Sequence, residues 1–303
     1  MANATMSIDW EDFGQMFGKY KFGEITEPIK GTIERQTKII LDLFDENNTK
    51  ATFFILGVLA EYRPEIVKEI ASRGHEIALH GQNHEPMFTL TPEKAYEDVS
   101  TSQKIVTDII GAPVYGYRAP FFSLIKDNLY LLEILADLGL IYDSSIFPML
   151  LPRYGIKNFP TEDALYKLPN DNQIVELPMT TAFFLNKQLP VSGGGYMRLM
   201  PEQLIKKVFK KIDAKNIDSM IYMHPYEFDS KSIDVSSNYP NGSEYSKLKV
   251  AALNFRWNIF RPTITSKLRS LLKQNQFITA EEKARQIINS STPVKLPALG
   301  AVI

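Results

Sequence analysis

The sequence predicts an α/β fold in which parallel strands form a sheet, either open or closed into a barrel. Short apolar runs alternate with amphipathic stretches at least four times along the chain, which is typical of βα units. The 303 residues are 44% hydrophobic and 23% charged, so they can bury a sizeable core. No repeat or low-complexity linker divides the chain, and we therefore expect a single unit over 1–303.

The first half of the chain supplies most of the alternation. Strands are expected at 6–10, 50–57, 75–80, 114–120 and 141–147. Helices are expected at 32–47, 64–74, 91–111 and 128–140. The helix at 91–111 has the clearest boundaries, because Thr91 can cap it, Pro92 suits its first turn and Gly111 can end it.

The second half is less regular. Residues 150–200 contain an apolar run at 174–178 and the glycine cluster SGGGY at 192–196. The elements expected after it are a basic amphipathic helix at 201–216, a strand at 219–228, a long polar loop at 229–246 and helices at 266–274 and 279–288. A solvated face explains the basic residues of 201–216 better than a membrane-surface contact does.

Composition excludes several classes of function. The net charge of −1 gives no sign of a nucleic-acid partner. The chain has no cysteine. Disulfides, thiolate metal sites and cysteine nucleophiles are therefore excluded, and any metal must be held by His, Asp or Glu. No apolar run approaches the roughly 18 residues of a transmembrane span. The first residues lack the pattern of a signal peptide, and we expect a cytoplasmic protein.

Ionisable residues stand where nearly every predicted strand ends. They are Asp9 with Glu11 and Asp12, His80 with His84, Arg118, Asp143 and His224. In parallel α/β folds the functional groups gather at the C-terminal ends of the strands. We therefore expect these side chains to share one rim of the sheet.

His80 and His84 are two of only four histidines, and they follow a strand rather than lying in a helix. Zinc and related divalent metals accept two imidazoles, a carboxylate and an open water position. The carboxylates at 9–12 could supply the third ligand and a general base. Taken singly, the histidine pair and the acidic cluster each also fit a solvated loop.

The remaining candidates have structural alternatives of their own. Arg118 calls for a carboxylate partner, as in a structural ion pair. Asp143 could pair with that arginine or with a histidine, or it could cap a loop. His224 could be an acid–base group, although a lone histidine in an apolar run is more often a core residue. The glycines at 192–196 allow a close approach to a ligand or a tight turn, and they match no nucleotide-binding fingerprint.

In this order, the motifs resemble the polysaccharide deacetylase family, the NodB-homology domain of carbohydrate esterase family 4. They read DWED, ATFFILG, GHEIALHGQNH, GYRAPFFS, YDSSIFP and MHPYEFD. Residues 258–272 resemble the C-terminal extension of deacetylases from surface-polysaccharide gene clusters. The resemblance implies one domain: a distorted (β/α)7-type barrel with irregular insertions at about 5–230, then a C-terminal helical extension at about 231–290.

The resemblance also implies a role for each rim residue. His80 and His84 would bind a divalent metal, usually Zn2+, together with a carboxylate of the first motif. Asp9 would be the general base and Arg118 would orient it. His224 would be the general acid, and Asp143 would tune it. The backbone N–H of Phe121 would stabilise the oxyanion.

This sequence departs from the family pattern at two points. Most members have two adjacent aspartates in the first motif, whereas here Asp9 precedes Trp10, Glu11 and Asp12, so either Glu11 or Asp12 could be the ligand. Leu79 stands where many members have serine, and we expect little effect from that change. The residues that could bind sugar are Phe121, Phe122, Tyr196, Arg198 and Tyr226.

The resemblance implies a metal-dependent hydrolase that removes acetyl groups from an N-acetylated sugar. Its expected substrate is a lipid-linked or nucleotide-linked glycan precursor for polysaccharide biosynthesis. One alternative is a cyclic-amide hydrolase of the allantoinase type on the same fold. Another is a carbohydrate-binding pseudoenzyme, which the presence of all the motif residues disfavours.

Overall fold

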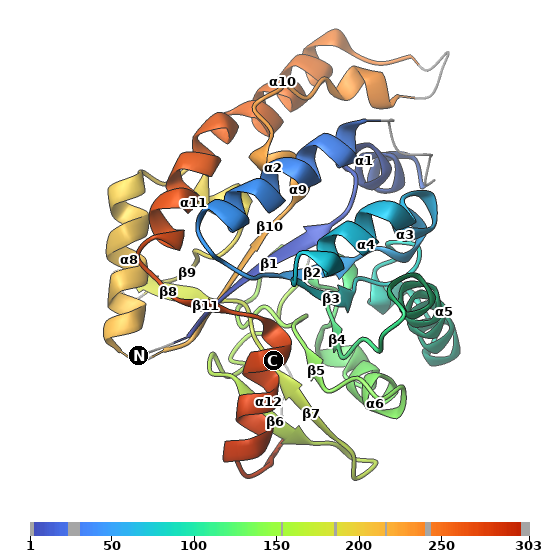
Figure 1. Ribbon diagram of the computed structural model, residues 1–303. Helices are drawn as coiled ribbons and strands as arrows, with labels where there is room; N and C mark the ends of the chain where they lie inside the picture. The colour runs from blue at the N-terminus through green and yellow to red at the C-terminus, as the bar shows by residue number, and fades with distance from the viewer. Residues whose placement is uncertain are drawn as a thin grey trace.

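The computed structural model describes residues 3–23, 31–152, 154–184, 187–215, 217–239 and 244–297. A strongly curved sheet of mostly parallel strands occupies the centre, and helices cover its outer face (Figure 1). This architecture confirms the α/β fold and the distorted barrel expected from the sequence.

The central strands follow the predicted alternation. They are β1 (Ala4–Trp10), β2 (Thr52–Ile55), β3 (Glu76–Leu79), β4 (Gly116–Tyr117), β5 (Tyr142–Asp143), β7 (Gln173–Glu176) and β10 (Ser219–Met223). The strands β6 (Ala164–Lys167), β11 (Phe277–Ile278) and β12 (Val294–Lys295) complete the sheet. The order is β10-β1-β2-β3-β4-β5-β7-β6-β12, with β11 paired to β1, and only the β6–β7 pair is antiparallel.

Neighbouring residues on a strand face opposite sides of this sheet. On β2, Phe53 packs among residues of the covering helices, whereas Phe54 packs in a second apolar cluster with Tyr142 and Val175. Both phenylalanines are fully buried. Burial on two faces explains why 50–57 reads as a continuous apolar run.

Irregular chain closes the barrel between β5 and β10. Leu177 donates its backbone N–H to the Asp143 carbonyl oxygen at 2.9 Å. Met220 donates its N–H to Thr180 Oγ1 at 2.7 Å, and Tyr222 donates its own to the Ser192 carbonyl at 2.9 Å. Residues 177–180 and 192–193 thus connect β5 and β10 without forming a regular strand between them, which distorts the barrel.

Most predicted helices are present. They are α2 (Thr32–Glu46), α4 (Pro64–Ser72), α5 (Pro92–Ile110), α6 (Leu131–Asp137), α8 (Glu202–Ala214), α11 (Ile264–Leu272) and α12 (Ala280–Ser290). The boundaries of α5 form as expected: Thr91 Oγ1 accepts from the Lys94 N–H, and Gly111 ends the helix with φ 69°.

Other elements were not predicted. They are α1 (Phe13–Phe22), α3 (Gly57–Tyr62), α7 (Gly194–Met197), α9 (Pro225–Phe228), α10 (Lys247–Asn258) and the hairpin of β8 (Thr181–Phe184) and β9 (Lys187–Pro190). The strand expected at 219–228 ends at Met223. Pro225 is the reason, because it cannot donate to a ladder and suits the first turn of a helix.

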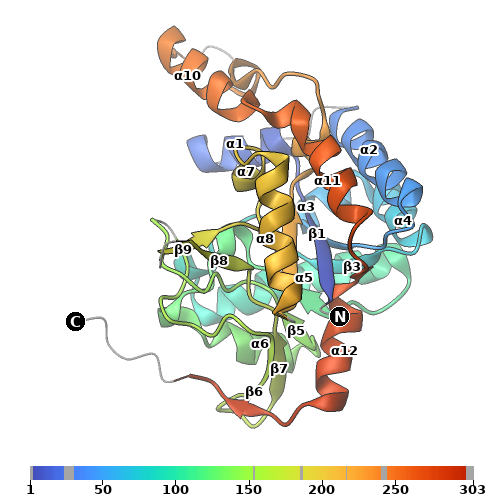
Figure 2. The same ribbon diagram turned by 90° about the vertical axis from the view of Figure 1, so that its left-hand side faces the viewer.

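The C-terminal helices are tied to the barrel rather than detached from it. In Figures 1 and 2, α10 and α11 lie beside α1 and α2, and α12 lies beside β6 and β7. Arg261 is buried and donates to the carbonyl oxygen of Tyr226 at 2.7 Å, which fixes the extension to the turn after β10. Among the described helices, none is long and apolar enough to cross a membrane.

Candidate active site

The expected rim exists, because the first three predicted groups lie at the C-terminal ends of parallel strands of the same sheet. Asp9 lies on β1, His80 follows β3 and Arg118 follows β4. His224 follows β10, which pairs with β1 on its other side. The parallel register places these ends together, and Asp9, His80 and Arg118 are buried.

Glu11, His80 and His84 form a cluster able to hold a metal ion. One ligand atom from each lies within 4.8 Å of the other two. Glu11 Oε2 is 2.5 Å from His84 Nε2 and 3.9 Å from His80 Nε2. Despite this proximity, Glu11 Oε2 is buried without a well-formed hydrogen bond, so its lone pairs remain available to a cation.

The charge state of the cluster suits a cation. Burial alone would raise the pKa of Glu11, but His84, His224 and His80 lower it to about 2, so its carboxylate is ionised. Burial lowers the pKa of His80 to about 4, so this imidazole is neutral and can act as a ligand.

The tautomer of His80 follows from its partner. His80 Nδ1 is 2.8 Å from the Arg118 carbonyl oxygen. A carbonyl oxygen only accepts, so Nδ1 carries the proton and the lone pair of Nε2 faces Glu11.

A carboxylate on α5 shapes the histidine loop. Asp98 accepts the backbone N–H groups of Gln82 at 2.9 Å and Asn83 at 3.2 Å. Gly81 and His84 both have positive φ, 73° and 52°, so the loop turns sharply between the two histidines. Asp98 was not among the predicted site residues, because nothing in the sequence links it to a loop 14 residues upstream.

Asp12 lies outside the cluster of Glu11, His80 and His84. Its Oδ1 accepts the N–H groups of Gly14 at 2.9 Å and Gln15 at 3.1 Å and so caps α1. Burial raises the pKa of Asp12 to about 6. The two alternatives left open by the sequence therefore differ in geometry, since only Glu11 faces the histidines.

Arg118 holds Asp9 in place. Its Nη1 donates to Asp9 Oδ1 at 2.6 Å and to Ser7 Oγ at 2.8 Å. Its Nε and Nη2 donate to the carbonyl and hydroxyl oxygens of Ser144, and its guanidinium lies 4.0 Å from the centre of the Phe54 ring. Four partners leave this fully buried guanidinium a single orientation.

The structure does not place Asp143 beside His224. Asp143 accepts from the hydroxyl of Ser145 at 2.5 Å and from its N–H at 3.0 Å, and it is hydrogen-bonded to Glu176. Burial and Asp143 together raise the pKa of Glu176 well above its ordinary value, so Glu176 supplies the shared proton. Asp143 therefore stabilises the loop after β5, and the expectation that it tunes His224 has no support in this geometry.

The partner of His224 is Glu227, which the sequence did not suggest. His224 Nδ1 lies 3.3 Å from Glu227 Oε2, and His224 Nε2 lies 3.4 Å from Glu11 Oε1. Burial alone would lower the pKa of His224, but Glu227, Glu11 and Asp9 raise it to about 9, which favours the imidazolium. Tyr226 stacks on the imidazole with ring centres 5.3 Å apart.

The proposed sugar-binding residues lie in different environments. Phe121 is half-buried, and its ring centre is 4.4 Å from that of His84. Tyr196 is half-buried on α7. Phe122 and Tyr226 are buried among other aromatic rings. Arg198 donates to the carbonyl oxygens of Trp257 and Arg256, both at 3.0 Å, and so ties down the end of α10.

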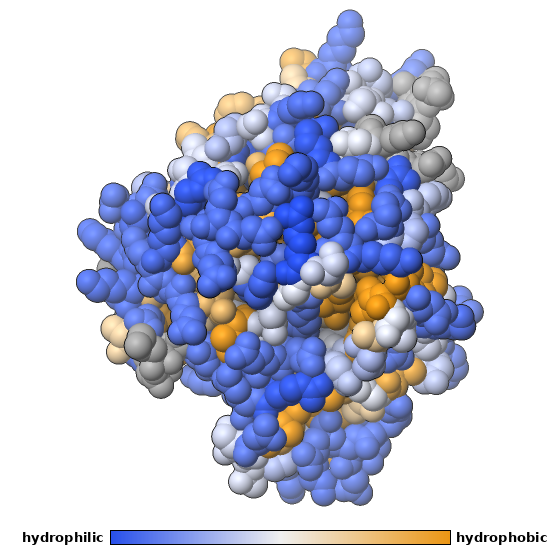
Figure 3. All heavy atoms as spheres, in the orientation of Figure 1, coloured by the Kyte–Doolittle hydropathy of each residue, from blue (hydrophilic) through white to orange (hydrophobic). Residues whose placement is uncertain are grey.

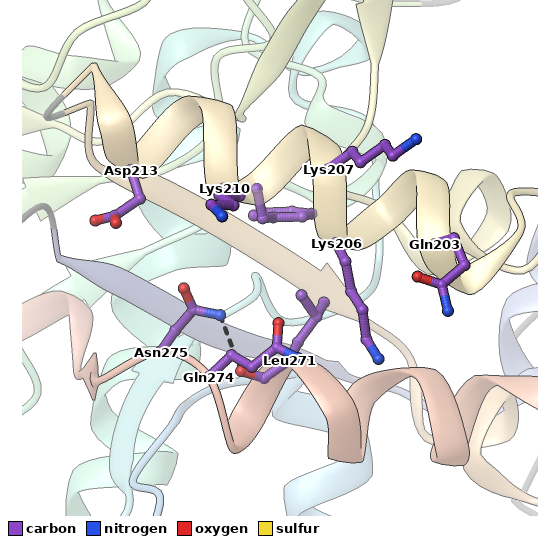
Figure 4. A pocket seen from close by; sticks show the side chains of 9 residues that line it. Gln203, Lys206, Lys207, Lys210, Asp213, Leu271, Gln274 and Asn275 are labelled. Carbon is purple, nitrogen blue, oxygen red and sulfur yellow. Dashed lines mark hydrogen bonds between the residues drawn. The ribbon is translucent and has the colours of Figure 1, made fainter.

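A separate groove lies between α8 and α11, on the helical shell. Figure 4 shows Lys206 reaching from α8 toward α11, and Lys207, Lys210 and Gln274 also line the groove. It contains none of Glu11, His80 and His84. The basic residues predicted at 201–216 therefore lie on the outer surface of the barrel, where Lys206 also pairs with Glu202. In Figure 3 hydrophilic residues cover most of the face seen there, and apolar ones show between them.

Sequence models of known families match both halves of the chain. Residues 29–142 match the family described as polysaccharide deacetylase, and residues 144–285 match a domain of unknown function, DUF3473. The first match contains His80, His84 and Arg118, and the second contains His224 and Glu227.

Curated relatives match about a third of the chain. A peptidoglycan-N-acetylglucosamine deacetylase of Bacillus cereus is 32% identical over 93 residues, which are 31% of this chain and 34% of the relative. A peptidoglycan deacetylase of Helicobacter pylori is 32% identical over 109 residues, 35% and 36% of the two chains. Chitin deacetylase 1 of Cryptococcus neoformans is 31% identical over 85 residues, which are 28% of this chain and 18% of the relative. The matched region thus spans little more than a third of these relatives at most.

Solved structures agree on the fold. A protein of Mycobacterium smegmatis described as a candidate polysaccharide deacetylase is 17% identical with a TM-score of 0.61, covering 99% of this chain and 96% of that one. Puue allantoinase is 14% identical with a TM-score of 0.60, covering 95% and 90%. At these identities the likeness establishes the barrel and leaves the substrate open.

Proposed function

We propose that this chain, whose residues 29–142 match the polysaccharide deacetylase family, is a metal-dependent N-deacetylase acting on an N-acetylated sugar of a glycan. One observation carries the proposal. The cluster of Glu11, His80 and His84 lies on the same rim as an arginine-bound aspartate and a protonated histidine. Such a rim combines a cation site, a base and an acid.

Glu11, His80 and His84 would hold the metal, with Zn2+ as the first choice for a donor set of two imidazoles and one carboxylate. The buried Glu11 Oε2 atom without a hydrogen bond fits that role. When bound, the cation would polarise the acetyl carbonyl and make a water molecule more acidic.

Asp9 is the proposed general base. Arg118 points the Asp9 carboxylate along a fixed direction, and Asp9 accepts the proton of the water that adds to the acetyl carbon. The backbone N–H of Phe121, whose ring packs against that of His84, is our proposed donor to the oxyanion.

His224 is the proposed general acid. Its raised pKa keeps a proton on Nε2 near neutral pH, and this nitrogen faces Glu11 and hence the cation site. As the C–N bond breaks, His224 gives that proton to the departing amine nitrogen. The products are acetate and a free amino sugar, so atoms and charge balance.

The substrate class follows from the named relatives, which act on peptidoglycan and chitin. We propose an N-acetylhexosamine within a glycan or a glycan precursor. Half-buried Phe121 and Tyr196 are the aromatic candidates for contact with its ring.

Acetate release tests the proposal. The zinc-loaded protein should release acetate from N-acetylglucosamine oligomers, and chelation followed by return of Zn2+ should abolish and restore that release. Hydrolysis of allantoin without acetate release would favour the cyclic-amide alternative. Metal binding with neither activity would favour a pseudoenzyme.

A further inference from the structure

We propose that Glu227 is the positioning residue for His224, and that Gly194 is a glycine because the Glu227 carboxylate occupies the space of a side chain there. The proposal rests on the proposed function for its kinetic consequence, since His224 is the general acid of that reaction. The contacts themselves can be tested without any substrate.

Glu227 holds His224 from two sides. Oε2 of Glu227 accepts the backbone N–H of His224 at 2.9 Å and lies 3.3 Å from its Nδ1. A carboxylate only accepts, so the proton of this contact is on Nδ1 of the imidazole. Nε2 is consequently the nitrogen that faces Glu11, at 3.4 Å from Oε1.

The partner is built into the turn that carries the histidine. Pro225 ends β10 and starts α9, so residues 224 and 227 lie one helical turn apart and on the same face. Only 1% of Glu227 is exposed, and among the described residues no other side chain donates a hydrogen bond to its Oε2. A buried carboxylate without a cationic partner is costly, and an imidazolium at Nδ1 reduces that cost.

The glycine cluster explains where this carboxylate fits. A Cβ added to Gly194 would lie 2.0 Å from Glu227 Oε2. Gly194 begins the helical turn α7, and its φ lies outside the left-handed region, so its backbone conformation does not require glycine. Gly195 is also in α7, but a Cβ added there would meet nothing within 4 Å. Space for Glu227 therefore distinguishes the two neighbouring glycines.

This arrangement assigns to Glu227 the role that the resemblance gave to Asp143. Asp143 is hydrogen-bonded to Ser145 and Glu176 instead. Glu227, Gly194 and His224 all lie within residues 144–285, the part of the chain outside the polysaccharide deacetylase match. The second half of the chain thus supplies both the acid and the group that orients it.

Imidazole NMR tests the contact directly. The chain has only four histidines, and H224Q identifies the signals of His224. In the zinc-loaded protein we expect a downfield, slowly exchanging Nδ1–H signal that moves upfield in E227Q and disappears in E227A, because a neutral or absent acceptor weakens the bond. Unchanged His224 signals in both folded variants would overturn the proposal.

Kinetics test the consequence. E227Q should lower kcat roughly 10- to 100-fold, the usual range for a group that orients an active-site histidine, while KM stays within about twofold. E65Q is the matched control, because Glu65 is an exposed glutamate on α4. A rise in KM at unchanged kcat would overturn the positioning role. If neither the wild type nor any variant releases acetate, the proposed function fails, and the NMR result still decides the contact.

A double-mutant cycle tests the role of Gly194. G194A should lower the melting temperature in the wild type and shift the His224 signal, whereas G195A should do neither. In an E227A background G194A should lower the melting temperature much less, because the clashing carboxylate is gone. If G194A lowers the melting temperature equally in both backgrounds, Gly194 is needed for another reason, and this part of the proposal is overturned.

Discussion

His80 donates its Nδ1 proton to the backbone carbonyl of Arg118, at 2.8 Å, while the guanidinium of the same arginine binds Asp9 at 2.6 Å. One residue therefore orients a candidate metal ligand through its backbone and the candidate base through its side chain. A shift of the strand end at Arg118 would move both groups together, so the cation site and the base keep a constant relative position.

The choice between Glu11 and Asp12 can be made by metal analysis. We expect about one zinc-like ion per chain, lost in the H80A/H84A double variant and strongly reduced in E11Q, because Glu11 is the cluster carboxylate. D12N is the matched control. Asparagine caps a helix as well as aspartate does, so D12N should keep both the metal and the fold.

Elemental analysis of the four purified proteins measures this. Loss of the ion in D12N with retention in E11Q would reverse the assignment. Absence of metal from the wild type, with no rise in melting temperature on adding Zn2+, would remove the basis for a metal-dependent hydrolase.

D9N should separate base catalysis from metal binding. Asparagine keeps the shape of the side chain and can still accept from Arg118, so the protein should fold and retain its ion. The amide cannot take up a proton, and kcat should fall by about 10²- to 10⁴-fold. Acetate release and metal content are measured on the same sample, and D12N again serves as the control. Activity within about tenfold of the wild type would assign the base elsewhere.

Strand ends were the part of the site that the sequence could predict. His80, His84, Arg118 and His224 lie on one rim because parallel strands end on the same side, and the order of strands and helices suffices to show this. The same rule could not choose between Glu11 and Asp12. That choice depends on α1, whose start at Phe13 was not predicted and whose first N–H groups occupy Asp12.

Glu227 was missed for a related reason. While 219–228 is taken as a strand, residues 224 and 227 fall on opposite faces and cannot meet. Proline at 225 converts the segment to a helical turn, which brings them to one face. Likewise, the sequence alone does not show why residue 194 is a glycine, because the carboxylate that fills the space beside it is 33 residues away.

R198A tests whether Arg198 binds sugar or holds the extension. Its guanidinium donates to two carbonyl oxygens at the end of α10, and only 8% of the residue is exposed. Losing two such bonds should lower the free energy of unfolding by about 1–3 kcal/mol and leave KM unchanged. Denaturant unfolding and KM for the acetylated substrate measure the two effects. The neighbouring exposed Arg256 gives the control variant R256A. A several-fold rise in KM without loss of stability would restore the sugar-binding role.

Glu76 should make stability fall as pH rises. Burial raises its pKa from 4.5 to about 7, although Thr52 and Tyr142 both donate to it. Below about pH 4.5 this carboxyl is protonated in both the folded and the unfolded chain, so it does not affect the pH dependence. Between about pH 4.5 and 7 the unfolded chain releases its proton while the folded one keeps it. The unfolding free energy should therefore fall by up to about 3 kcal/mol across this window.

E76Q should remove most of this fall, because glutamine does not titrate and the Tyr142 hydroxyl can accept from its amide. Urea unfolding of the chelated protein from pH 4.5 to 8 measures the difference, with E65Q as the control for an exposed glutamate. The difference in unfolding free energy between E76Q and the wild type should be small at pH 4.5 and largest above pH 7. Only above pH 7 does the folded wild type contain a buried, ionised Glu76. If instead the two curves run parallel over the whole range, Glu76 is already ionised at low pH, and its three donors outweigh its burial.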